Sequence, residues 1–209
     1  SINEKNKVRS NYKIKNVHRA VGTRLSHYIF KRFGKKGIKE NTVEINLSGS
    51  AGQSLGAFGI KGLKLNVTGD ANDYVGKGLS CATIVVKPPT ESNLVSNENT
   101  IIGNTVLYGA TSGKLFAAGQ SGERFAVRNS GADAVVEGCD SNGCEYMTGG
   151  NVVILGKVGD NFAAGMTGGM AFVYDPNCEF ENYVNPSSVI WQAPETEYWK
   201  NYLKNLINE

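Results

Sequence analysis

The stretch GLKLNVTG, residues 62–69, contains the pattern on which most of the chain is built. Its first glycine is followed by apolar residues at every second position, Leu63, Leu65 and Val67, as in a strand that buries one face. The same arrangement follows five further turn positions: Cys81, Gly113, Gly131, Gly150 and Gly169. The six turn positions are separated by 19, 32, 18, 19 and 19 residues, so the sequence predicts a structural repeat of about 19 residues.

The single long spacing contains the polar segment PPTESNLVSNENT, residues 88–100. Removing its 13 residues reduces the spacing of 32 to 19. Its two prolines also disfavour a strand in the interior of a sheet. We therefore predict that this segment is an insertion loop between two repeats.

A repeat of this length fits one coil of an all-β, single-stranded solenoid. One coil alone buries too little apolar surface to offset its conformational entropy, so six or seven coils over residues 42–175 are expected to form one cooperative unit. The 26 glycines fit the tight corners of such coils. The predicted organisation is a basic arm with a helix (1–41), a glycine-rich solenoid (42–185) and a tail with a helix (186–209).

Two flanking helices are expected to cover the open ends of this stack. Apolar residues recur with helical spacing from His18 to Phe33, and Gly34 then ends that helix. In the tail, Pro194 is expected to begin a helix with the following apolar stripe: Trp199, Tyr202, Leu203 and Leu206.

Charge is unevenly distributed along the chain. Residues 1–40 contain twelve Lys or Arg and two Glu, whereas residues 41–209 carry a net charge of −7. A basic arm before an acidic body can bind nucleic acid, but the same charges also suit a solvated or docking arm. We favour the docking arm and predict no nucleic-acid partner. No apolar run of 18 residues is present, so no membrane partner is predicted either.

The cysteines Cys81, Cys139, Cys144 and Cys178 do not predict a metal site. Cys139 and Cys144 are separated by four residues rather than two, and only two histidines are available to complete a ligand set. Four cysteines are also few for a disulfide-stapled secreted protein. We expect reduced thiols and an intracellular location.

Three glycine-rich motifs suggest nucleotide binding but lack the required residues. GATSGK at 109–114 has three residues between its glycines instead of four, and Leu115 replaces the Ser or Thr of a phosphate-binding loop. Gly76-Lys77-Gly78 lacks the third glycine of a dinucleotide fingerprint. The segment 165–169 is interpreted as a corner of the repeat. His18 and His27 lie in the predicted first helix, away from the thiols that they would have to activate.

Two polar clusters remain as candidates for acid–base chemistry. The segment 122–138 contains Glu123, Arg124, Arg128, Asn129, Asp133 and Glu137, and a second cluster contains Asp70, Asn72 and Asp73. Paired carboxylates can act as a general acid and base. In a repeat protein such residues more often form ion pairs and turn caps, which is the interpretation we favour. We therefore assign no catalytic, cofactor-binding or metal-binding residue.

Three long runs, residues 49–89, 101–138 and 143–175, resemble the C-terminal domain of the large subunit of glutamate synthase. The most specific segments are GDANDYVGKGLS (69–80) and GERFAVRNSGA (122–132), and HRAVGTRLS (18–26) is similar to the segment that leads into that domain. Two positions depart from the family: Asn142 and Asp160 stand where the family usually has His and Arg.

The resemblance implies a right-handed parallel β-helix with a structural role. It also implies partners, namely the amidotransferase and FMN-barrel domains of an enzyme that converts glutamine and 2-oxoglutarate into two glutamates. FMN and a 3Fe-4S cluster are expected in those other domains and no cofactor in this chain. The expected location is cytoplasmic or plastid. As an alternative, the chain also resembles a separately encoded assembly subunit of another redox enzyme, formylmethanofuran dehydrogenase.

Overall fold

The computed structural model describes residues 6–209. Strands dominate the chain, and two α-helices and three short 3-10 helices accompany them. In chain order the elements are β1 (Val8–Ile14), α1 (Thr23–Phe33), η1 (Gly34–Lys36), β2 (Val43–Ala51), β3 (Leu63–Ala71), β4 (Ser80–Lys87), η2 (Ser96–Glu98), β5 (Thr100–Ile102), β6 (Ser112–Ala117), β7 (Gln120–Ser121), β8 (Asp133–Val136), β9 (Thr148–Ile154), β10 (Gly168–Val173), η3 (Phe180–Tyr183) and α2 (Glu197–Ile207).

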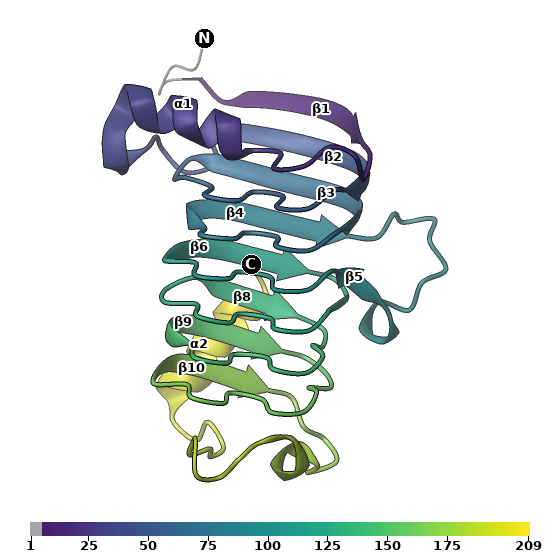
Figure 1. The fold of residues 1–209 in the computed structure, drawn as a ribbon, viewed down its shortest axis with the longest axis vertical. Helices are drawn as coiled ribbons and strands as arrows, with labels where there is room; N and C mark the ends of the chain where they lie inside the picture. Colours follow the sequence, from purple (N-terminus) through teal and green to yellow (C-terminus); the bar gives the residue numbers. More distant parts are fainter. Residues whose placement is uncertain (1–5) are drawn as a thin grey trace.

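The strands stack into one long sheet in the order β1-β2-β3-β4-β6-β8-β9-β10, with β5 and β7 beside this path (Figure 1). All paired strands are parallel. One row across the sheet joins six apolar side chains: Leu65, Ile84, Leu115, Ala134, Val152 and Ala171. Their spacing of 19, 31, 19, 18 and 19 residues confirms the repeat of about 19 residues.

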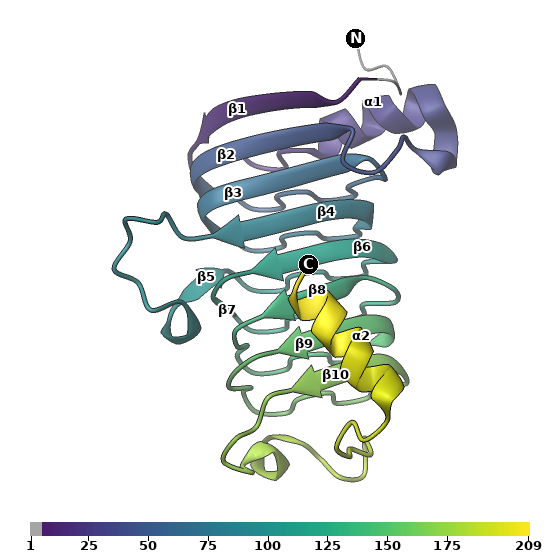
Figure 2. The same cartoon turned by 180° about the vertical axis from the view of Figure 1, so that it is seen from behind.

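The insertion between repeats is also confirmed. β4 ends at Lys87, and the chain returns to the sheet at Thr100 in β5. Between them the chain leaves the stack, forms η2 and projects from its side in both views (Figures 1 and 2). Thr83 to Val86 of β4 pair in continuous register with Lys114 to Ala117 of β6, so the stack continues past the insertion.

The predicted fold class, an all-β right-handed parallel β-helix with coils of about 19 residues, is wrong. The structure is a mostly parallel sheet of ten strands with few helices, an α/β-type arrangement. Each repeat contributes one main strand to this sheet. The remainder of the repeat consists mainly of turns, because alternate residues there have positive φ and leave the extended region.

These turn segments form a second layer that faces the sheet. In each of six segments three alternate residues have positive φ, and thirteen of these eighteen are not glycine: Ser54, Phe58, Tyr74, Thr105, Leu107, Arg124, Ala126, Arg128, Asn142, Cys144, Tyr146, Asn161 and Ala163. Backbone hydrogen bonds join neighbouring segments, such as Ala126 N–H to Val106 O at 2.9 Å and Cys144 N–H to Phe125 O at 2.7 Å. Such bonds satisfy backbone groups that a sheet would otherwise pair.

The core lies between the sheet and this turn layer. Leu65, Ile84 and Leu115 project from the sheet and Phe125 from a turn segment, and all four have no solvent exposure. One polar side chain, Asn129, is equally buried. Its Oδ1 accepts from Ala132 N–H at 3.0 Å and its Nδ2 donates to Ala132 O at 2.9 Å, so the amide closes its own turn.

The first predicted helix is present but begins at Thr23 rather than His18. Residues 17–22 instead continue the turn layer, with Ala20 N–H donating to Gln53 O at 2.9 Å and Gly56 N–H to Val21 O at 2.8 Å. The helix α1 therefore covers the N-terminal end of that layer, as expected of a cap. The arm before it contributes β1, which is the edge strand of the sheet beside β2.

The second helix also forms, at Glu197 rather than Pro194, and Thr196 Oγ1 accepts from Trp199 N–H at 3.4 Å as its N-cap. It does not cap the end of the sheet. It lies across the outer face over β8, β9 and β10 (Figure 2), where Leu206 packs against Val135 and Val153. The apolar stripe was predicted correctly, but its partner is a sheet face and not an open edge.

Candidate interaction surface

Three of the candidate carboxylates, Asp70, Asp73 and Asp133, form hydrogen bonds within the fold. One buried oxygen of Glu137, Oε2, has no hydrogen-bond partner among the described residues. Asp73 Oδ1 accepts from Asn104 N–H at 2.8 Å, and Asp70 accepts from Ser50 Oγ at 2.9 Å. Asp133 Oδ1 accepts from both the N–H and the side-chain amide of Asn151, at 3.1 and 3.0 Å. These carboxylates link neighbouring repeats. Asp73 does so from a turn, as predicted, whereas Asp70 and Asp133 lie in β3 and β8 and bond to the adjacent strands.

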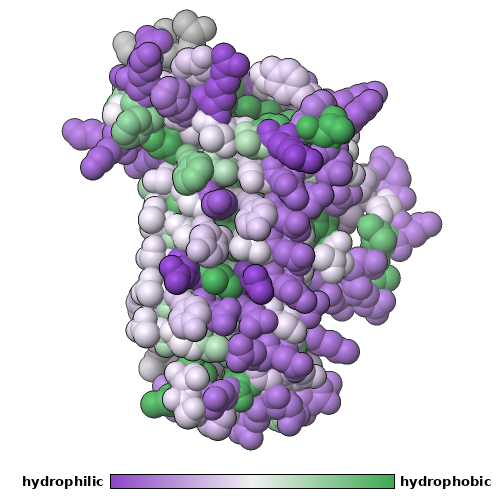
Figure 3. Space-filling model, viewed as in Figure 1, coloured by the Kyte–Doolittle hydropathy of each residue, from purple (hydrophilic) through white to green (hydrophobic). Residues whose placement is uncertain are grey.

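Among the described residues, 6–209, the 122–138 cluster forms none of its predicted ion pairs. Within residues 6–209 the three salt bridges are Arg9–Glu44, Lys114–Glu209 and Lys200–Glu197. Arg124 and Arg128 are instead exposed on the outer surface of the turn layer. Figure 3 shows this layer, with hydrophilic residues gathered toward the side from which the insertion projects.

The four thiols fall into two classes. Cys139 and Cys144 are buried, and burial raises the pKa of Cys139 to about 12 and that of Cys144 well above its ordinary value. Cys81 and Cys178 are exposed. His18 lies before α1 and His27 lies within it, at the N-terminal end of the sheet. The buried thiols lie far along the chain, between β8 and β9. No group of three or more metal-ligating side chains occurs among the residues described.

The glycine-rich motifs form parts of repeats. GATSGK (109–114) runs from a turn into β6, and Gly76-Lys77-Gly78 lies in a turn segment between β3 and β4. No helix follows either of them, so neither provides the helix N-terminus of a phosphate site. A side chain at Gly78 would place its Cβ 2.6 Å from the Phe58 ring, which explains why this position is glycine.

Asn142 and Asp160, the two positions that depart from the family pattern, are neighbours in space. Asn142 N–H donates to Asp160 O at 2.8 Å, across adjacent turn segments. The bond uses backbone atoms only, so it does not depend on the side chains at these two positions.

A surface groove of about 810 Å³ lies at the C-terminal end of the sheet. β10 lines one side of this C-terminal groove, and the segment 186–196 lines the other. Its large apolar members are Phe162, Met166, Met170, Phe172, Phe180, Val189, Ile190, Trp191 and Trp199. Sequence reasoning missed this surface, because residues 176–196 show no periodicity that would place them beside β10. None of the described helices is long and apolar enough to cross a membrane.

A family model described as "GXGXG motif" matches residues 1–209. Among curated proteins, the large chain of glutamate synthase (NADPH) from Azospirillum brasilense is 63% identical over 206 residues, which are 99% of this chain and 14% of that protein. Ferredoxin-dependent glutamate synthase from Pyropia yezoensis is 50% identical over 207 residues, 99% of this chain and 13% of that protein.

A third relative, glutamate synthase (NADH) from Schizosaccharomyces pombe, is 55% identical over 174 residues, 83% of this chain and 8% of that protein. The chain thus spans 14% or less of the length of these three relatives. Most of each relative lies outside the matched segment.

Proposed function

Because this chain belongs to the GXGXG-motif family and corresponds to a segment of glutamate synthase, we propose that it is a structural domain of that enzyme. One observation supports this most strongly: 99% of the chain matches a glutamate synthase large chain at 63% identity, yet covers only 14% of it. The remaining length is available for other domains.

In this proposal the chain supplies rigid packing surface and no catalytic group. This structural role is supported by polar side chains that form hydrogen bonds within the fold. Asp73 and Asp133 accept hydrogen bonds from the backbone N–H groups of Asn104 and Asn151 in the following repeat, and Asn129 closes its own turn. A carboxylate that acts as a general base needs access to substrate instead.

The proposed enzyme transfers the amide nitrogen of glutamine to 2-oxoglutarate and yields two glutamates. FMN and a 3Fe-4S cluster belong to other domains in this account, and the chain packs between the amidotransferase and FMN-barrel domains of the same polypeptide. The location is proposed to be intracellular, cytoplasmic or plastid. Relatives named for NADPH, NADH and ferredoxin all match the chain, so the match does not select an electron donor.

Affinity capture from native extract tests the proposal. The chain, produced with an affinity tag, is expected to be recovered as part of, or together with, a flavin-containing polypeptide that carries the FMN barrel. The alternative is an assembly subunit of another redox enzyme, such as formylmethanofuran dehydrogenase. Recovery with a molybdenum or tungsten enzyme would overturn the glutamate synthase assignment.

A further inference from the structure

The two edges of the sheet differ in a way that points to a partner. β1, the N-terminal edge, carries the basic side chains Arg9 and Lys13. β10, the C-terminal edge, has the sequence GGMAFV and no charge. Charged residues, lysine above all, protect an exposed edge strand against pairing with another chain. β1 has this protection and β10 lacks it.

The free backbone groups of β10 can be identified from the ladder. Tyr174 N–H donates to Ile154 O at 2.9 Å, directly after β10. Because backbone groups of a parallel strand alternate between its two neighbours, those of Ala171 and Val173 face away from β9. Within residues 6–209 no hydrogen bond reaches these groups from the outer side. The regular part of this edge, Met170 to Val173, is therefore available to accept another strand.

The C-terminal groove beside this edge offers apolar contacts. Ile190 is 97% exposed, Trp191 38% and Met170 37%, although all three are large apolar side chains. An extended strand places alternate side chains on opposite faces. A strand on β10 would therefore direct every second side chain toward these residues.

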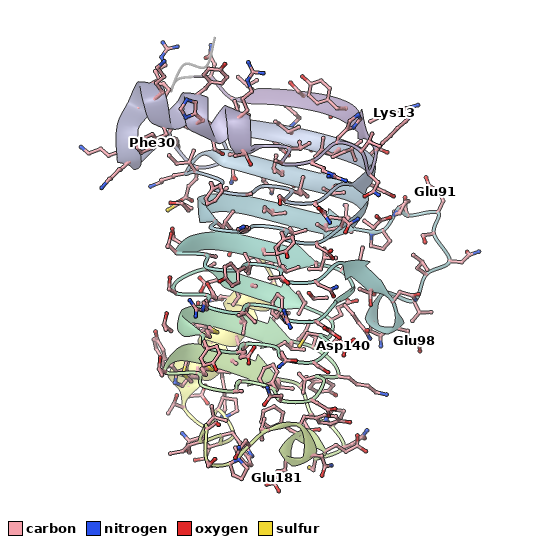
Figure 4. The ribbon with its side chains drawn as sticks, in the orientation of Figure 1. Lys13, Phe30, Glu91, Glu98, Asp140 and Glu181 are labelled. Carbon is pink, nitrogen blue, oxygen red and sulfur yellow. The ribbon has the colours of Figure 1, made fainter. Side chains whose placement is uncertain are left out.

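The charge around the groove restricts the partner further. Residues 160–200 contain six carboxylates, Asp160, Asp175, Glu179, Glu181, Glu195 and Glu197, and one basic residue, Lys200. Figure 4 places Glu181 at this end and Lys13 toward the opposite end. A segment with Lys or Arg beside its apolar residues is complementary to this end, whereas an acidic segment would be repelled.

We propose that β10 is a docking edge for an extended segment with alternating apolar side chains and flanking Lys or Arg, contributed by another domain of the same polypeptide. The segment adds a strand to the sheet and fills the C-terminal groove. This inference rests on the proposed function, which supplies the other domains. A segment tethered in the same polypeptide binds at high effective concentration, so even this short edge is sufficient.

Hydrogen exchange of the full-length enzyme, compared with the 209-residue chain, tests the docking edge. We expect the amides of Ala171 and Val173 to exchange at least about tenfold more slowly in the full-length enzyme. In the matched variant Met170→Lys, which adds a charge to the edge, this protection should be lost. The thermal unfolding midpoint of the 209-residue chain should change little with Met170→Lys, because Met170 is 37% exposed and a lysine there can reach solvent with its ammonium group. Equal exchange rates in both forms of the unmodified protein would overturn the proposal.

Photo-crosslinking identifies the occupant. Ile190 is replaced by p-benzoylphenylalanine in the full-length enzyme, with Tyr12 in β1 replaced as the control, since it is 59% exposed at the other edge. We expect an intramolecular cross-link from position 190 to a segment that contains Lys or Arg in another domain, and none of this kind from position 12. A cross-link to a second copy or to a different polypeptide would overturn the proposal. Both results leave the glutamate synthase assignment intact, because affinity capture tests that assignment separately.

Discussion

Arg9 in β1 and Glu44 in β2 stand opposite each other in the parallel register and form an ion pair, with Arg9 Nη2 2.8 Å from Glu44 Oε2. The second oxygen of Glu44 accepts from Asn66 Nδ2 in β3 at 2.9 Å. One carboxylate thus links three consecutive strands at the N-terminal edge. The hydrogen bond from Arg9 holds the pKa of Glu44 below its ordinary value.

Replacing Arg9 by Ala should loosen β1 with little effect on the rest of the sheet. The pair is partly exposed, so the expected cost is at most about 1 kcal/mol of the free energy of unfolding. Because the pKa of Glu44 is lower in the folded protein than in the unfolded chain, the pair stabilises at neutral pH and this contribution disappears as the pH falls through the folded pKa. The effect of Arg9→Ala on hydrogen exchange of β1, compared at pH 7 and at about pH 2.5, measures it, since the lower pH lies well below the ordinary glutamate pKa. A mutational effect that is the same at both pH values would contradict this account.

The two exposed thiols should react much faster than the two buried thiols in the native protein. Only the thiolate reacts, and burial keeps Cys139, with a pKa of about 12, and Cys144 protonated and inaccessible. We expect two of the four cysteines, Cys81 and Cys178, to react with a disulfide reagent in the native protein at pH 8, and all four after denaturation. Modification of Cys139 in the native protein at the rate of Cys81 would show that the core is open.

The Leu65→Ala change should destabilise the whole stack. Leu65 has no solvent exposure, and loss of a buried leucine costs about 2–5 kcal/mol. Its neighbour Lys64, whose side chain lies on the opposite face of β3, provides the control, and Lys64→Ala should change stability by less than about 0.5 kcal/mol. Urea unfolding is expected to remain a single transition, because the repeats share one core. Two separated transitions in Leu65→Ala would argue against one cooperative unit.

Substitution by glycine in the turn layer should stabilise the protein at positions with positive φ and destabilise it at neighbouring positions. Arg124 has a φ of +61°, which is costly for a side chain that bears Cβ, so Arg124→Gly should stabilise the chain by a few tenths to about 1 kcal/mol. The adjacent Glu123 is not among the residues with positive φ, and Glu123→Gly should destabilise it by about 0.5–1 kcal/mol. The two midpoints of urea unfolding can be compared directly. The same sign for both changes would contradict the proposed strain.

The repeat and its insertion could be predicted from the sequence, because each strand faces one core and places apolar residues at every second position. The turn layer could not, since thirteen non-glycine residues, Ala126 and Cys144 among them, have positive φ. Their strain is compensated by hydrogen bonds between segments that are distant in sequence. The same limit produced the wrong fold class, because apolar content between the main strands does not distinguish a second strand from a turn segment that also contributes to the core, as Phe125 and Ala126 do.

The edge strand β1 and the surroundings of β10 also could not be predicted from the local sequence. β1 reads as a polar arm, VRSNYKI, and becomes a strand only because β2 offers it a partner. The stripe of α2 was visible from Leu203 and Leu206, but a stripe identifies the buried face of a helix and not what covers it. The C-terminal groove was missed for the same reason, since it is formed by segments without periodicity around the edge of β10.

The central claim is that this chain supports an enzyme without performing its chemistry. The most direct test is the absorbance spectrum of the purified 209-residue chain, combined with glutaminase and glutamate synthase assays. We predict no flavin absorbance, no hydrolysis of glutamine and no formation of glutamate from glutamine and 2-oxoglutarate. A flavin spectrum that copurifies with the chain, or turnover of either substrate above background, would contradict the account.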